Sequence, residues 1–165
     1  MLAGRISGAV ALVALVVVGA ALVAGCGGGG DETTVETVTP TKAEFIRKAD
    51  KICRNTREAI IDGSVPKIEK VVGTPKAQQV EFELISNVLI PALEKEVDDL
   101  RALGMPAGDE AEIETILKLT EGAIAEAKTE PETYAQGTSY REGSEHYGQA
   151  YQLSLKYGME ECPMR

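Results

Sequence analysis

The stretch that decides the fold is "TKAEFIRKADKICRNTREAII", residues 41–61. Thr41 stands three residues before Glu44, the spacing of a capping box, in which hydroxyl and carboxylate each bond a free backbone N–H. Side chains suited to a core then recur every three or four residues. They are Phe45, Ala49, Ile52, Cys53, Thr56 and Ile60. This pattern predicts an amphipathic helix that begins after Thr41 and ends at Gly63.

Three further helices are expected downstream. The second helix is expected to start at "GTPK", where Thr74 is a cap and Pro75 suits the first turn. Pro91 predicts a kink or break within this helix, which ends at Gly104. The remaining start and stop signals are Asp109 and Glu112 in "GDEAE", Ser139 and Glu142 in "SYRE", and a final Gly158. No segment of this region alternates like a strand. The sequence therefore predicts an all-α fold, a four-helix antiparallel bundle.

The first 26 residues, "MLAGRISGAVALVALVVVGAALVAGC", have the layout of an export signal. Arg5 precedes an apolar stretch over 9–24, which is somewhat short for a membrane span of about 20 residues. Val23 to Cys26 is similar to the bacterial lipobox. That resemblance implies a diacylglycerol on Cys26, cleavage before it, and often a further acyl chain such as palmitate. An ordinary secretory signal or an uncleaved anchor helix are the alternatives.

The chain thus divides into three parts. Residues 1–25 are expected to be a lipoprotein signal peptide. Residues 26–40 are expected to be the lipidated cysteine and a flexible tether, which begins with four glycines and spans on the order of 20 Å. Residues 41–165 are expected to form the helical bundle, at the extracytoplasmic face of the cell membrane.

Cys53 and Cys162 remain once Cys26 carries lipid, because the chain has three cysteines. Outside the cytoplasm such a pair usually oxidises. We therefore expect a disulfide that ties the first helix to the tail after the last one. A metal site is disfavoured because neither cysteine has a CxxC partner. Two buried free thiols are the remaining alternative.

The charge of the chain excludes one class of partner. It has 17 basic and 26 acidic residues, for a net charge of −9, and removing residues 1–25 takes away Arg5 and leaves −10. Nucleic acid is therefore not an expected partner. We expect the lipid to hold the protein on the membrane.

No catalytic, metal or cofactor site is predicted. His146 is the one histidine, so a di-iron site with paired histidines is excluded, and no nucleophile motif accompanies it. We expect it to be a surface residue flanked by Glu145. The acidic run Glu94, Glu96, Asp98 and Asp99 is interrupted by Lys95, which favours a solvated face over a calcium site.

All five tyrosines lie in the last third of the chain. Tyr140, Tyr147 and Tyr151 recur at helical spacing. One interpretation is a surface for a partner, because tyrosine offers rigid apolar area with a polar tip. The interpretation that the pattern favours is that they fill the bundle core, since amphipathic stripes usually do.

Three segments carry a family resemblance: "FIRKADKICRNT", "LRALGMPAGDE" and "YGMEEC". They resemble segments of the small secreted and lipid-anchored helical proteins of actinobacteria, over most of residues 45–162. The resemblance implies the same fold, the same location outside the cytoplasm and the same disulfide, and it implies no activity.

These observations predict a membrane-anchored extracytoplasmic lipoprotein. Its expected role is that of a non-catalytic binding or structural module of the cell envelope, whose partner is an envelope protein or a small ligand. The alternative is an enzyme, or a carrier of a metal or small ligand, with a site that no motif marks.

Overall fold

In the computed structural model the described residues are 39–131, 134 and 144–162. The first helix, α1, covers Lys42–Ile68. Its start is the expected capping box: the Glu44 amide donates to Thr41 Oγ1 at 3.3 Å, and the Thr41 amide donates to Glu44 Oε2 at 3.0 Å. The buried positions Phe45, Ala49, Cys53 and Ile60 are among those predicted.

The prediction that the first helix ends at Gly63 is wrong, because α1 continues to Ile68. Gly63 is a contact point: a Cβ there would lie 2.9 Å from Val88 Cγ1. The missing side chain therefore lets the neighbouring helical segment approach closely. Pro66 lies inside the last turns of α1, where it lacks the N–H that would bond to the Asp62 carbonyl.

The second helical arm has three pieces, α2 (Ala77–Leu84), the π-helical segment η1 (Ile85–Leu89) and α3 (Ile90–Ala102). The break expected at Pro91 is confirmed. Pro91 cannot donate to the carbonyl four residues back, and the Ile90 N–H bonds to the Ile85 carbonyl five residues back. Thr74 caps the turn before α2 instead of the helix itself, because its Oγ1 accepts from the Lys76 amide at 3.3 Å.

The last two helices are α4 (Glu110–Thr129) and α7 (Glu145–Tyr157). Ser144 caps α7, with its Oγ accepting from the Tyr147 amide at 3.0 Å. The capping box predicted at Ser139 lies outside the described residues. Gly158 ends α7 as predicted, and its φ of +106° is one that glycine adopts without strain.

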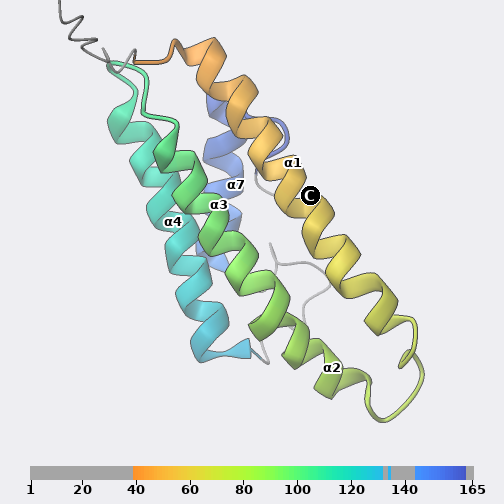
Figure 1. Ribbon diagram of the computed structural model, residues 1–165. Helices are drawn as coiled ribbons and strands as arrows, with labels where there is room; N and C mark the ends of the chain where they lie inside the picture. The colour runs from red at the N-terminus through yellow and green to blue at the C-terminus, as the bar shows by residue number, and fades with distance from the viewer. Residues whose placement is uncertain (1–38, 132–133, 135–143, 163–165) are drawn as a thin grey trace, which may run out of the picture. The chain divides into compact units, whose positions relative to one another are not determined.

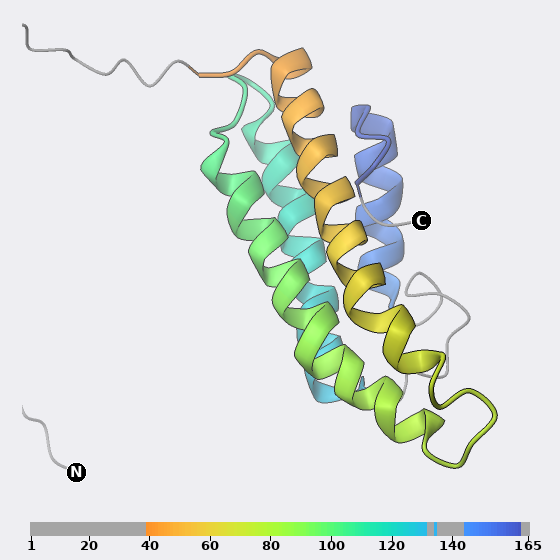
Figure 2. The same ribbon diagram turned by 45° about the vertical axis from the view of Figure 1, so that its right-hand side comes forward.

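The described helices pack as an antiparallel bundle, and no strand occurs among the described residues. Figures 1 and 2 show α1 and the arm of α2 and α3 side by side, with α4 beside α3 and α7 beside α4. Aliphatic side chains from α1, η1, α3 and α4 fill the interior between them. The predicted all-α bundle is therefore confirmed.

A disulfide joins Cys53 on α1 to Cys162 in the tail, as expected. Both cysteines are buried. The tail is also held by polar contacts: the Glu161 amide donates to Asp50 Oδ1 at 2.9 Å, and the Glu161 carboxylate pairs with Arg57 at 2.6 Å. These bonds fix the segment around Cys162 against the middle of α1.

Replacing both cysteines, in Cys53→Ala/Cys162→Ala, is expected to lower the free energy of unfolding by about 4–5 kcal/mol. The bond closes a loop across a sequence separation of 109 residues, and its loss restores that chain entropy to the unfolded state. Urea unfolding followed by circular dichroism measures the change. Both proteins carry Cys26→Ser, so that the parent has no cysteine besides Cys53 and Cys162. As a control, the parent should show no reactive thiol when it is unfolded without reductant. An unchanged midpoint would contradict the prediction.

Candidate functional site

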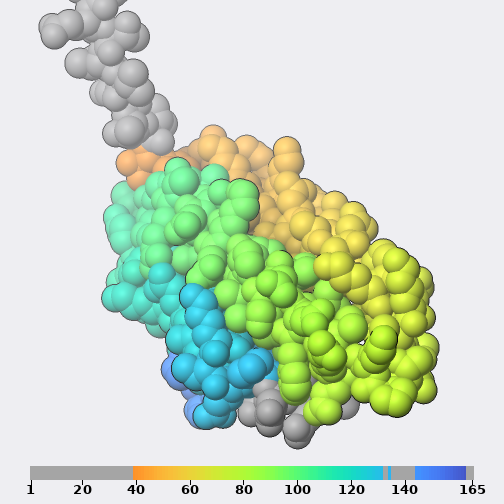
Figure 3. Space-filling model, turned by 60° about the horizontal axis from the view of Figure 1, so that its bottom comes forward, coloured from red at the N-terminus to blue at the C-terminus, as the bar shows by residue number. Residues whose placement is uncertain are grey.

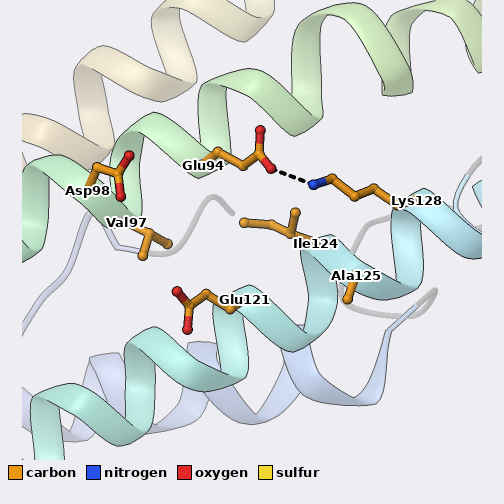
Figure 4. A pocket seen from close by; sticks show the side chains of 7 residues that line it. All are labelled: Glu94, Val97, Asp98, Glu121, Ile124, Ala125 and Lys128. Carbon is orange, nitrogen blue, oxygen red and sulfur yellow. Dashed lines mark hydrogen bonds and ion pairs between the residues drawn. The ribbon is translucent and has the colours of Figure 1, made fainter.

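A groove of about 420 Å³ runs between α3 and α4. Its floor is apolar, formed by the buried Val97 and Ile124, with the small Ala125 leaving room beside them. Its rim is charged, with Glu94, Asp98, Glu121 and Lys128 (Figure 4). The two helices run antiparallel, so residues more than twenty positions apart in sequence face each other across it.

Three ion pairs connect α3 to α4: one lies at one end of the groove, and Arg101 makes the other two, to Glu121 and Glu114, at the other end. At one end Lys128 Nζ lies 2.5 Å from Glu94 Oε1. At the other, Arg101 donates two hydrogen bonds to Glu121, of 2.6 and 3.1 Å. These bonds from Arg101 lower the pKa of Glu121 against the opposing effect of its partial burial. The carboxylates at both ends are therefore largely neutralised.

Asp98 is the groove carboxylate that has no ion pair among the described residues. It is exposed at the rim, one residue after the buried Val97. One uncompensated negative charge beside an apolar floor suits a cationic group that carries a short hydrocarbon portion. The groove can therefore hold and orient such a group by charge and burial.

A second polar cluster links α7 to α4. Glu126 accepts a 2.5 Å hydrogen bond from Ser144 Oγ and contacts His146 Nδ1. Burial raises the pKa of Glu126, but the bonds from Ser144 and His146 outweigh it and the pKa is lowered. The imidazole rests against Gly122, where a Cβ would lie 2.8 Å from His146 Cδ2.

This cluster joins serine, glutamate and histidine in an order that does not activate the serine. Glu126 lies between the other two, so the Ser144 hydroxyl donates to a carboxylate and receives no help from an imidazole base. Ser144 also caps α7. The arrangement fastens the start of α7 to α4. His146 is a surface residue as predicted, and it contacts Glu126 on α4.

Glu96 departs from the predicted solvated acidic face, because it is 3% exposed. It faces α1 near Thr56, whose hydroxyl donates to the Ile52 carbonyl at 3.2 Å, and its Oε2 has no hydrogen-bond partner among the described residues. Burial raises the pKa of Glu96 to about 7; the nearby Thr56 hydroxyl opposes this effect, and the Asp99 charge adds to it. The groove does not include this carboxyl, which lies in the bundle interior.

The described tyrosines are distributed through the packing. Tyr147, on α7, is 1% exposed, so it belongs to the core, and Tyr151 is half-buried. Tyr140 lies outside the described residues, so the proposed surface of Tyr140, Tyr147 and Tyr151 is not assembled among them. Two others serve as polar links: Tyr134 donates to the Ala123 carbonyl at 2.7 Å, and Tyr157 donates to Asp109 at 2.8 Å.

Sequence reasoning missed the groove residues on α4, Glu121, Ile124 and Lys128. A signal for them exists in the spacing: charged residues seven apart enclose an apolar residue on one face of the predicted helix. What the sequence does not give is the register between α3 and α4. That register decides which charges meet.

No group of three or more metal-ligating side chains occurs among the described residues. Within the same residues, no helix has the length and apolarity to cross a membrane. The lipidation residue predicted from the sequence, Cys26, lies outside them. Comparisons with family models, curated proteins and solved structures found no match.

The buried Glu96 carboxyl predicts a pH-dependent stability. In the unfolded chain Glu96 ionises near pH 4.5, whereas in the folded protein it keeps its proton to about pH 7. The folded state therefore binds more protons in this window, and stability falls as pH rises from about 4.5 to 7. Glu96→Gln should remove this loss and raise the free energy of unfolding at pH 8 by up to about 3 kcal/mol.

Urea unfolding of parent and variant from pH 4 to pH 8 tests this expectation. Glu58→Gln is the matched control, because Glu58 is an exposed carboxylate on α1. The stability difference between Glu96→Gln and the parent should grow with pH, whereas the control should follow the parent. Parallel curves for all three proteins would contradict the role assigned to Glu96.

Proposed function

We propose that the protein is a lipid-anchored, extracytoplasmic binding module of the cell envelope and acts without catalysis. The observation that carries this proposal is the Cys53–Cys162 disulfide. Disulfides persist in oxidising compartments and are rare in the cytosol, so this bond supports export. Export agrees with the signal-like residues 1–25 and with the lipobox ending at Cys26.

The lipid and the bundle have separate tasks in this proposal. Acyl chains on Cys26 hold the protein at the membrane, since two or more buried chains give durable anchoring. The tether lets the domain sample orientations. The groove between α3 and α4 supplies a site for a cationic group with an apolar portion, with Asp98 as its counter-charge.

Lipidation predicts a specific mature N-terminus. Mass spectrometry of the protein from bacterial membranes should show a chain beginning at Cys26 that carries ester-linked acyl chains, with residues 1–25 removed. Cells grown with labelled palmitate should label the parent and leave Cys26→Ser unlabelled. A free Cys26 thiol in a chain that keeps residues 1–25 would contradict the anchoring proposal.

Binding in the groove predicts a dependence on Asp98. Titration with n-butylammonium, followed by NMR of the Val97 and Ile124 methyl groups, should shift both signals. Asp98→Asn should weaken the response about fivefold, as loss of one partly exposed charge contact is worth up to about 1 kcal/mol.

Two controls define that titration. Asp62→Asn removes an exposed carboxylate on α1, far from the groove, and should leave the response unchanged. The neutral n-pentanol should shift the same methyl signals much less than the amine. Equal responses to amine and alcohol would show that the groove does not recognise cations.

A further inference from the structure

The large aliphatic side chains that the described part of the chain exposes are gathered in one place. They are Ile61, Val65, Ile68 and Val72, with exposures of 49, 42, 37 and 71%. We call this set the α1 stripe. The spacing of four, three and four residues places them on one face of a helix. Val72 follows the end of α1, but its N–H bonds to the Ile68 carbonyl at 2.9 Å, so the helical turn continues to it.

The α1 stripe is exposed because the described part of the fourth helix is short. α1 has 27 residues, or about 40 Å, whereas α7 has 13, or about 20 Å. The end of α7 lies at the beginning of α1, where the Tyr157 and Phe45 rings pack 6.2 Å apart. Figure 2 shows the end of α1 and its connection to α2 extending beyond α7. Figure 3 shows the second half of α1 and the connection to α2 at an edge of the bundle.

A row of carboxylates borders the α1 stripe. Glu58, Asp62 and Glu69 are separated by four and seven residues, which places them along one line of the helix surface beside the stripe. All three are exposed, and none has an ion pair or hydrogen bond among the described residues. We call this set the acidic row. An apolar strip with one charged border is the pattern by which grooves select amphipathic helices.

We propose that the second half of α1 is a docking face for a basic amphipathic helix of a partner protein. The partner helix lies along the α1 stripe, where α7 does not reach. Its aliphatic residues cover Ile61, Val65, Ile68 and Val72, and its lysines or arginines pair with the acidic row. This inference rests on the binding role proposed above and names the class of partner. It requires neither the lipid nor the groove.

The same charges disfavour other occupants. A second copy would bring a second acidic row and a second chain of net charge −9 against the first, so charge opposes a symmetric dimer. An anionic lipid surface would meet the acidic row and be repelled.

A designed peptide tests the docking face. The probe is a helical peptide of about 18 residues with leucines at the spacing of the α1 stripe and lysines along one border; its twin has glutamates for the lysines. The protein is the mature chain, residues 26–165, with Cys26→Ser, so that no lipid contributes. Fluorescence anisotropy should show binding of the lysine peptide and at least tenfold weaker binding of the glutamate twin.

Variants locate the contact. Ile61→Ser/Val65→Ser should weaken binding at least tenfold, because burying each aliphatic side chain contributes about one tenfold step. Asp62→Lys/Glu69→Lys should weaken the lysine peptide and strengthen its twin. Glu83→Lys/Glu160→Lys changes the net charge equally, at exposed sites outside the acidic row, and should leave both affinities unchanged. Thermal melts confirm that each variant is folded.

Several outcomes would overturn the inference. One is equal affinity of the parent and Ile61→Ser/Val65→Ser for the lysine peptide. Another is a dimer in sedimentation velocity that this variant abolishes, which would make a second copy the occupant. A third is co-sedimentation with phosphatidylglycerol vesicles that depends on the α1 stripe. None of these measurements depends on a lipid at Cys26 or on Asp98, so failure here leaves the tests of lipidation and of the groove independent.

Discussion

The covalent link between Cys53 and Cys162 is the constraint on which the other contacts depend. A helix of 13 residues, such as α7, has little stability alone. The disulfide holds the segment that follows α7 against α1, and this brings Glu161 between Asp50 and Arg57. With its end fixed there, α7 lies along α4, and Ser144 and His146 reach Glu126. A sequence-distant pair of sulfurs thus orders the last helix.

Much of this fold could be predicted from local sequence chemistry. The capping box at Thr41, the break before Pro91 and the glycine that ends α7 each act within one helical turn, so the sequence contains all that is needed to recognise them. The disulfide could be predicted because Cys53 and Cys162 are the two cysteines that remain once Cys26 is assigned to lipidation. The end of α1 could not be found this way. Gly63 reads as a stop signal, but the glycine is there to make room for Val88, a tertiary contact that the local sequence does not reveal.

The candidate site was less predictable, for a physical reason. Glu96 lies at helical spacing among Leu93, Val97 and Leu100, so periodicity predicts that its side chain faces the interior. Its charge predicts exposure, but in the structure the side chain is buried. The groove depends on which residues of α3 face which of α4, and Glu94 meets Lys128 across 34 positions of sequence. Such a register follows from packing of the whole bundle. Tyr147 illustrates the same limit, because spacing alone did not separate core from surface.

The π-helical segment η1 places a constraint on the length of the second arm. It sits between two stretches of regular helix, each of which turns by about 100° per residue. A π-helical turn holds one residue more than an α-helical turn, so losing one residue from Ile85–Leu89 would let the arm run as a plain helix while α2 and α3 keep nearly the same faces. Losing one residue elsewhere in the arm would instead rotate one part relative to the other by about 100°, and side chains that face α1 or α4 would then point into solvent. A single deletion should therefore be tolerated far better within these five positions than in the regular helix on either side.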